Sequence, residues 1–261
     1  MGRFMVVSKA DNLSEYETIA KQYNVGFEIN DFYEAAVLDD ENAQSQLIQQ
    51  YLDAGVPEGS TMHGAFMEVV VFSEDEKIAA ISKMRMRQSM EIAKQLGVRG
   101  VVFHTNHNPM ITGESYEDNV VWKTAEYVEE LLKEYPEIDI YMENMFDTTP
   151  EVLVGISERL CQYSNYGVCL DYAHASISDS PMRDWVEMLA PYLKHVHISD
   201  NDLKRDLHIA VGTGHINWNE FAKYYRTCFD QCTVLVEVMG AEAQIQSLNY
   251  LRDNFVGLFQ Y

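Results

Sequence analysis

Short runs of β-branched and aromatic residues alternate with longer stretches of helical period along this chain, and no other feature constrains its fold as strongly. We expect strands at residues 4–8, 26–30, 61–66, 100–105, 138–144, 166–171, 193–199 and 233–239. We expect helices at 13–23, 76–96, 116–135, 150–163, 217–229 and 243–255, among others. Repeated strand–helix units of this kind predict a parallel sheet covered by helices.

Eight strand–helix units in 261 residues predict an α/β fold, a single (β/α)8 TIM barrel over residues 1–261. Such barrels typically have about 250 residues. The alternative is a doubly wound open sheet, but no GxGxxG motif follows the first expected strand. Because 47% of the residues are hydrophobic and no linker interrupts the pattern, one large core is expected.

The charge of the chain bears on its partners. A net charge of −22 disfavours binding to nucleic acid and to anionic membranes. No apolar segment approaches the roughly 20 residues needed to span a bilayer, and the first residues lack the pattern of a secretory signal. The four cysteines form no CxxC pair, so reduced structural thiols are expected. These features together indicate a cytoplasmic protein.

Potential metal ligands stand at or near the carboxyl ends of six successive expected strands, where a barrel carries its chemistry. They are His63, His104, Glu143, Asp171, His197 and Glu237. Burying a carboxylate in an apolar strand costs on the order of several kcal/mol unless a cation or hydrogen-bond donors satisfy it. Glu143 and Glu237 are therefore the strongest indications of a metal site.

A polar loop follows the apolar run at residues 193–198 and closes on two glycines, Gly212 and Gly214. Imidazole and carboxylate groups gathered at a strand end are the usual components of a divalent-metal site. The residues of this kind in and beside the loop are His197, Asp200, Asp202, Asp206 and His208. We expect His195, by contrast, to be a hydrogen-bonded core histidine.

The ordered motifs resemble those of the xylose isomerase-like TIM barrel superfamily, which includes sugar isomerases, sugar epimerases and the endonuclease IV type of abasic-site nuclease. The resemblance runs from about residue 61 to residue 237. In chain order the motifs are HG, EN, DYAH, HISDND, DLH, GTG and a final glutamate, beginning at His63, Glu143, Asp171, His197, Asp206, Gly212 and Glu237.

The epimerase-like members hold one divalent ion through one residue from each of four strands. The matching positions are Glu143, Asp171, His197 and Glu237. Such a ligand set favours Mn²⁺, with Zn²⁺, Co²⁺ or Mg²⁺ as alternatives. The resemblance implies an isomerase or epimerase that acts on a small sugar or polyol through an enediolate, with Glu143 and Glu237 as acid and base. It also allows a homo-oligomer.

Two further residues are predicted to contact the substrate. His174, three residues after Asp171, could orient a substrate hydroxyl. Arg205, in the loop after the seventh strand, could balance an oxyanion.

The nuclease-like members of the superfamily hold three zinc ions through nine ligands, and each ligand type has a counterpart here. The nine are His63, His104, Glu143, Asp171, His174, His197, Asp206, His208 and Glu237. An endonuclease IV-like zinc phosphodiesterase acting on abasic DNA is therefore the second interpretation. Against it, the expected loop at residues 30–44 carries five carboxylates and no Lys or Arg, the residues that normally contact phosphates. A sugar dehydratase or lyase and a non-catalytic binding protein are further alternatives.

Overall fold

The computed structural model describes residues 3–258, except the side chain of Glu114, and contains a closed barrel of eight strands. Neighbouring strands in the chain pair in parallel, and the last strand pairs with the first. The strands are β1 (Phe4–Ser8), β2 (Gly26–Ile29), β3 (Thr61–His63), β4 (Gly100–His104), β5 (Asp139–Glu143), β6 (Tyr166–Asp171), β7 (Leu193–Ile198) and β8 (Thr233–Val236).

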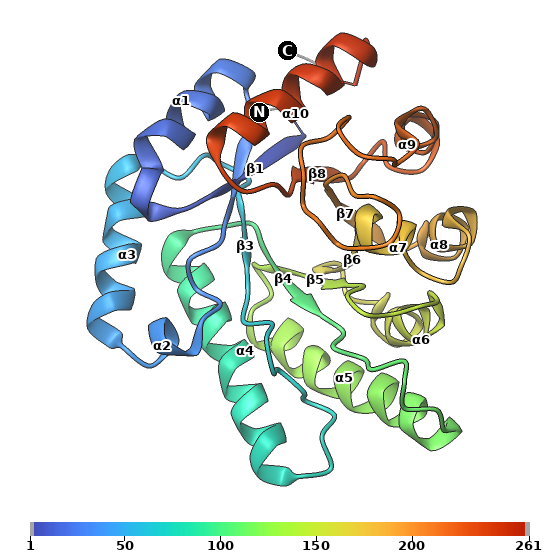
Figure 1. Ribbon diagram of the computed structural model, residues 1–261. Coiled ribbons are helices and arrows are strands. Elements are labelled where there is room, and N and C mark those ends of the chain that lie inside the picture. The colour runs from blue at the N-terminus through green and yellow to red at the C-terminus, as the bar shows by residue number, and fades with distance from the viewer. Residues whose placement is uncertain (1–2, 259–261) are drawn as a thin grey trace.

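Helices surround the barrel, and the first strand lies near the last helix (Figure 1). They are η1 (Ala10–Asn12), α1 (Leu13–Tyr23), α2 (Ala35–Leu38), α3 (Glu41–Ala54), α4 (Glu76–Leu96), α5 (Glu114–Glu134), α6 (Glu151–Leu160), α7 (Tyr172–Ser176), α8 (Met182–Leu189), α9 (Trp218–Thr227) and α10 (Ala241–Asn254). This architecture confirms the predicted TIM barrel. None of the helices between residues 3 and 258 is long and apolar enough to cross a membrane.

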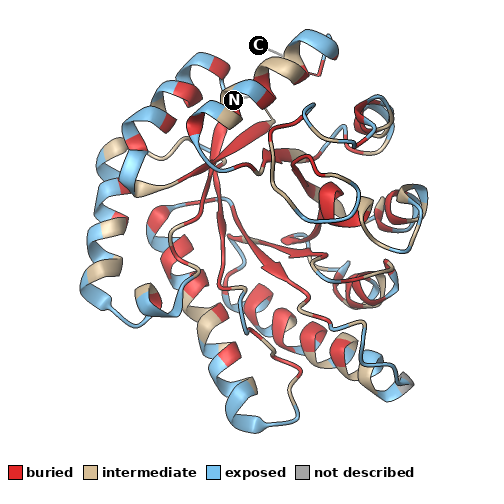
Figure 2. Ribbon diagram, in the orientation of Figure 1, coloured by how far each residue is buried: buried red, intermediate tan, exposed pale blue. Residues whose placement is uncertain are grey.

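The main core lies between the barrel wall and the inner faces of the helices. The strands are buried except at the first residues of β5, β7 and β8, whereas most helices are buried on one side only (Figure 2). On α8, for example, Trp185, Val186 and Leu189 are fully buried while Glu187 is exposed. This one-sided burial follows from the helical period of the apolar residues.

The interior of the barrel is more polar than its outside wall. Glu28 on β2 contacts His195 on β7, and these two strands are not neighbours, so the contact crosses the barrel. The apolar side chains of the interior form small clusters, one of which consists of Val102, Tyr141 and Cys169. Because side chains alternate along a strand, every second residue of each strand points into this interior.

The strands differ from expectation at their ends, and one stretch expected as a loop is helical. β3 ends at His63, three residues before its expected end. The next residue is Gly64, where a Cβ would lie 2.3 Å from the Phe103 ring. β8 ends at Val236, so Glu237 follows the strand. The stretch 30–44, expected as a loop, holds α2 and the start of α3, because Asp40 caps α3 by accepting two backbone N–H groups.

Candidate metal centre

Four polar side chains meet at the carboxyl ends of the last four strands. They come from Glu143, Asp171, His197 and Glu237, and one ligand atom of each lies within 4.8 Å of the others. The parallel register pairs Asp171 with His197, which brings both to the same end of the barrel. His197 Nδ1 lies 3.3 Å from Glu143 Oε1 and 3.4 Å from Glu237 Oε2. We call these four residues the central group.

The central group is largely buried and its oxygens are unsatisfied. Among residues 3–258, Asp171 Oδ2, Glu237 Oε2 and both oxygens of Glu143 find no hydrogen-bond partner. Buried polar atoms are nearly always paired, so several orphaned carboxylate oxygens in one place favour a compensating cation. Three carboxylates and one imidazole are donors that a divalent ion accepts. The residues present therefore fit a metal ion.

Burial also affects protonation in the absence of an ion. Burial, opposed by the charge of His174, raises the pKa of Asp171 to about 7. The backbone N–H of His174 donates to Asp171 Oδ1 at 2.6 Å, so Oδ2 is the oxygen left for a ligand. Burial likewise opposes ionisation of Glu237, but the charge of His197 lowers the pKa of Glu237 to about 2.

A second group, on β3, β4 and β5, shares Glu143 with the central group. Glu143 Oε2 lies 3.3 Å from His104 Nε2 and 3.6 Å from His63 Nε2, and the two Nε2 atoms are 3.1 Å apart. His63 Nδ1 donates to the carbonyl of Gly64 at 3.0 Å. Because a carbonyl can only accept, a neutral His63 carries its free lone pair on Nε2, which faces the group.

A third group consists of His174, Asp206 and His208. Asp206 Oδ2 lies 3.3 Å from His174 Nε2 and 2.9 Å from His208 Nε2. The other ring nitrogen of each histidine donates to a backbone carbonyl, that of Asn144 or Glu237. Burial opposes the charged form of His208, yet Asp206 raises its pKa to about 10. Without an ion, two protonated imidazoles flank one carboxylate, and an ion could replace the protons on their Nε2 atoms.

The loop that supplies Asp206 and His208 is organised by Asp200. This carboxylate is fully buried and accepts four hydrogen bonds. The donors are the backbone N–H groups of Asn201, Gly212 and Ile216 and the indole of Trp218. Asp200 therefore holds the loop together and offers no free oxygen to an ion.

The structure brings nine of the ten predicted site residues together and leaves one outside. Arg205 pairs with Asp202 at 2.8 Å, and 72% of its side chain is exposed. Sequence reasoning missed Glu28, which is 1% exposed on β2 and lies 3.2 Å from His197 Nε2. A glutamate inside the apolar run GFEI is the same signal that pointed to Glu143. The functional roles of all these residues remain predictions.

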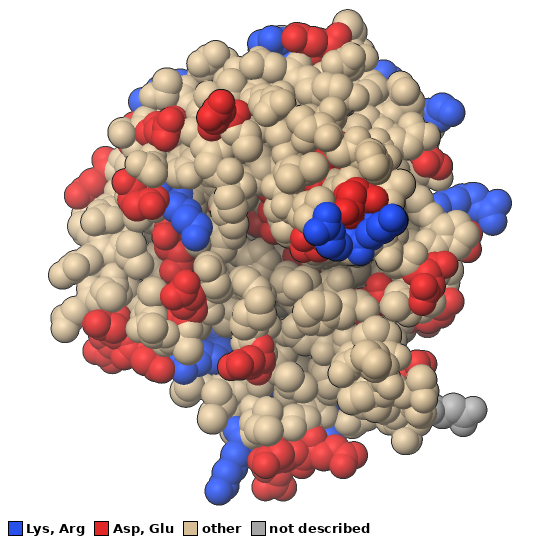
Figure 3. Space-filling view, in the orientation of Figure 1, with Lys and Arg blue, Asp and Glu red and all other residues tan. Residues whose placement is uncertain are grey.

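A cavity of about 670 Å³ lies among the loops that follow β3, β4 and β5. Asn106, Tyr116 and Phe146 line it, but none of the grouped histidines or carboxylates does. Among the described side chains that line it, the charged ones are Glu68 and Glu74 and none is Lys or Arg, so the cavity disfavours a phosphate. Figure 3 shows a hollow on the face in view, with acidic atoms inside it.

Fold and site together define a TIM barrel with a ligand-rich centre at the carboxyl ends of its strands. The chain belongs to the xylose isomerase-like TIM barrel family, whose model matches residues 19–254.

The chain is also similar to individual proteins in sequence and in structure. The uncharacterized protein MJ1311 of Methanocaldococcus jannaschii is 25% identical over 205 residues, 74% of this chain and 68% of the relative. The TTHB071 protein of Thermus thermophilus, solved after soaking with ZnCl2, superposes with a TM-score of 0.77 at 20% identity, covering 97% of this chain and 98% of that one.

Two further solved structures are similar in fold. A D-tagatose 3-epimerase-like protein gives a TM-score of 0.76 at 21% identity, covering 97% of this chain and 96% of that one. Endonuclease IV of Thermus thermophilus gives a TM-score of 0.66 at 15% identity, covering 96% of this chain and 98% of that one. At these identities, the likeness shows the shared fold and leaves the reaction open.

Proposed function

We propose that this protein is a divalent-metal-dependent isomerase or epimerase that acts on a small sugar or polyol. The observation that carries the proposal is the placement of Glu143 and Glu237, which reach His197 Nδ1 from β5 and from the end of β8. Their orphaned oxygens lie in a buried centre. Two carboxylates that approach one point from different strands can act on opposite faces of a substrate.

The central group would hold the ion, with Mn²⁺ favoured because most of its donors are carboxylate oxygens. When bound, the ion would polarise a substrate carbonyl and stabilise an adjacent enediolate. Glu143 or Glu237 would take the proton from the carbon beside that carbonyl, and the other would return one. His174, whose ring is held by the carbonyl of Asn144, would orient a substrate hydroxyl.

Exchange of substrate hydrogen with solvent tests this proposal. The protein, loaded with Mn²⁺, is incubated in D₂O with a panel of unphosphorylated ketoses and aldoses, and deuterium beside the carbonyl is measured by NMR. Glu143→Gln and Glu237→Gln should each lower exchange by about 10²- to 10⁴-fold, the usual contribution of a general base. Glu187→Gln, at an exposed position on α8, should leave it unchanged. Normal exchange in either site variant would contradict the assigned roles.

A second candidate function, a multi-zinc phosphodiesterase, is favoured by the second and third groups. Each offers three ligands, and Glu143 lies between two groups as a bridging carboxylate would. The net charge of −22 and the acidic hollow argue against a DNA substrate. A sugar dehydratase or lyase would use the same base as the isomerase but expel a hydroxyl group.

An abasic-site duplex and a small chromogenic phosphodiester separate the two candidates. With added zinc at low salt, we expect neither substrate to be cleaved. Cleavage that disappears in His104→Ala, a ligand of the second group only, would place the phosphodiesterase first.

A further inference from the structure

Directly beneath the central group, the barrel interior contains a buried polar chain where apolar side chains are usual. It runs from Thr233 on β8 through His195 on β7 and Glu28 on β2 to His197. His195 and His197 are both fully buried, and Glu28 is 1% exposed. A buried carboxylate is expensive unless its neighbours satisfy it, so this placement calls for an explanation.

The contacts fix one consistent arrangement of protons. Glu28 Oε2 accepts from Thr61 Oγ1 at 2.7 Å and from His195 Nε2 at 3.2 Å. With Nε2 as the donor of a neutral His195, Nδ1 accepts from Thr233 Oγ1 at 2.6 Å, closer than the other acceptor of that hydroxyl, the carbonyl of Lys194 at 3.4 Å. Both nitrogens of His195 are therefore used, with the ring neutral.

The remaining oxygen of Glu28 faces the predicted metal ligand. Glu28 Oε1 lies 3.2 Å from His197 Nε2, while His197 Nδ1 faces Glu143 and Glu237 at 3.3 and 3.4 Å. If an ion binds Nδ1 at the central group, the one proton of a neutral His197 must be on Nε2, and Glu28 Oε1 is the oxygen beside it. The lone pair of a neutral His197 is then on Nδ1, where the central group meets.

We propose that Glu28 is a positioning residue that holds His197 in the tautomer and orientation in which Nδ1 binds the ion. His195 and Thr61 in turn fix Glu28. Carboxylates that hold the second nitrogen of a metal-binding histidine set its tautomer and raise its basicity. This inference rests on the metal centre proposed above.

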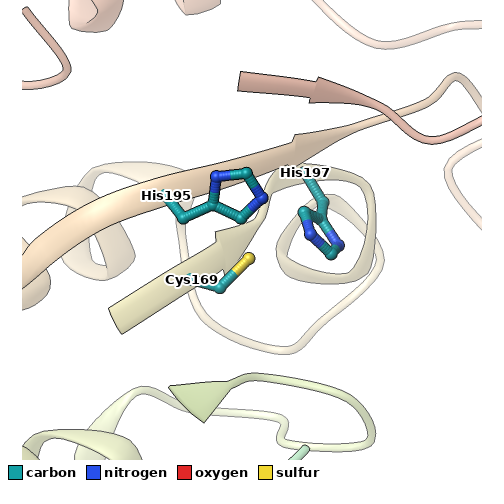
Figure 4. A group of neighbouring side chains, drawn as sticks. All are labelled: Cys169, His195 and His197. Carbon is teal, nitrogen blue, oxygen red and sulfur yellow. The ribbon is translucent and has the colours of Figure 1, made fainter. Parts of the chain in front are cut away.

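The same region offers another grouping, Cys169 with His195 and His197, whose ligand atoms lie within 4.8 Å of one another. Figure 4 shows the sulfur of Cys169 on β6 directed toward the strand that carries both histidines. An ion there would need a lone pair from His195, but Thr233 and Glu28 occupy both of its nitrogens. The hydrogen bonds of His195 therefore argue against a further ion in this grouping.

Metal affinity tests the role of Glu28. Apo protein is titrated with Co²⁺ and Mn²⁺ against a chromogenic chelator, and the visible spectrum of the Co²⁺ form is recorded. Glu28→Gln keeps the shape but presents an amide N–H₂ to one of the two imidazoles, so one contact is lost. We expect about 10- to 100-fold weaker binding, as for other residues that support a metal ligand, and a shifted Co²⁺ spectrum.

Asp31→Asn is the matched control. Asp31 follows the same strand and is held by Tyr51 and the backbone N–H of Ala10, away from His197. Its variant should bind Co²⁺ with unchanged affinity and spectrum.

The outcomes separate this inference from the proposed function. A wild-type protein that binds no ion would refute the metal centre itself. A folded Glu28→Gln protein with wild-type affinity and spectrum would refute only the role of Glu28. If Glu28→Gln does not fold, Thr61→Val is measured instead, because it removes the hydroxyl that donates to Glu28. Weaker Co²⁺ binding with an altered spectrum in Thr61→Val would support the role of Glu28. Unchanged Co²⁺ affinity and spectrum would overturn it.

Discussion

At the scale of single residues, two equally buried carboxylates illustrate the difference between a structural and a functional acid. Asp200 and Glu143 are both fully buried. Asp200 accepts four hydrogen bonds, whereas neither oxygen of Glu143 has a hydrogen-bond partner among the described residues. Since an unsatisfied buried carboxylate destabilises the fold, the proposed ion would account for Glu143, whereas the loop that Asp200 organises accounts for Asp200.

Replacing Asp200 should therefore reduce stability without any ligand being involved. In Asp200→Asn at least one of the four N–H groups loses its acceptor, and the free energy of unfolding should fall by about 1–3 kcal/mol. Urea denaturation of the metal-free protein measures this change. Asp53→Asn, on the exposed side of α3, should change it by less than about 0.5 kcal/mol. Equal stabilities of the two variants would contradict the role given to Asp200.

The four free thiols should differ in reactivity according to burial. Cys161 is exposed, whereas Cys169 and Cys232 are buried. Burial raises the pKa of Cys232 to about 12, so almost no thiolate is present at pH 8. Iodoacetamide should modify Cys161 in the folded protein and reach Cys169 and Cys232 only after unfolding, as peptide mass spectrometry would show. Modification of Cys232 as fast as Cys161 would contradict this packing.

At the scale of elements, the strands were predicted closely and the helices less so. Each strand core coincides with its expected run, because β-branched residues between turn signals identify buried strands. The expected helices did not include α3, which buries only Ile48 and Tyr51, or the short helices α2, α7 and α8, of four, five and eight residues. Weak or short amphipathic patterns leave little for sequence reasoning to detect.

The candidate site was predictable for a related reason. Most of its ligands stand at strand ends, and parallel strands in a closed barrel bring those ends together. Glu28 carries the same local signal as Glu143, a carboxylate inside an apolar strand, but its contact with His197 joins β2 to β7 across the barrel, and no local pattern encodes that contact. Arg205 was predicted from its loop, but an ion pair with Asp202 keeps its side chain at the surface.

The loop between β7 and α9 should be sensitive to one added methyl group. A Cβ on Gly214 would lie 2.4 Å from the carbonyl of Asn201 and from Asp200 Oδ1, so Gly214→Ala must displace the loop. Overpacking of this kind typically costs about 1–3 kcal/mol. Thermal and urea unfolding should show this decrease in the free energy of unfolding. Gly113→Ala, where nothing lies within 4 Å of the new Cβ, is the control and should unfold as the wild type does.

At the scale of the whole molecule, charge and metal binding are connected. A net charge of −22 opposes the compact state, and three carboxylates of the central group add local repulsion. A cation bound only by the folded protein relieves that repulsion and stabilises the fold by mass action.

Removal of the ion should therefore lower the melting temperature. At a free ion concentration about 100 times the Kd, binding stabilises a protein by about 2.7 kcal/mol. Calorimetry with and without Mn²⁺ should show this gain in the wild type. Asp171→Asn, which removes one central ligand, should gain much less. An identical gain in both proteins would indicate that the ion binds elsewhere, for example to the acidic surface.

The most direct test of the central claim is elemental analysis of protein purified without chelators and then desalted, expressed as ions per chain. The account predicts one Mn, Co or Zn ion per chain, bound by Glu143, Asp171, His197 and Glu237. It also predicts that the Asp171→Asn protein contains no such ion. Two or three zinc ions per chain would mean that the second and third groups bind metal as well, and phosphodiester substrates would be tested first. Wild-type protein without metal that also fails to take up Mn²⁺, Co²⁺ or Zn²⁺ would contradict the account.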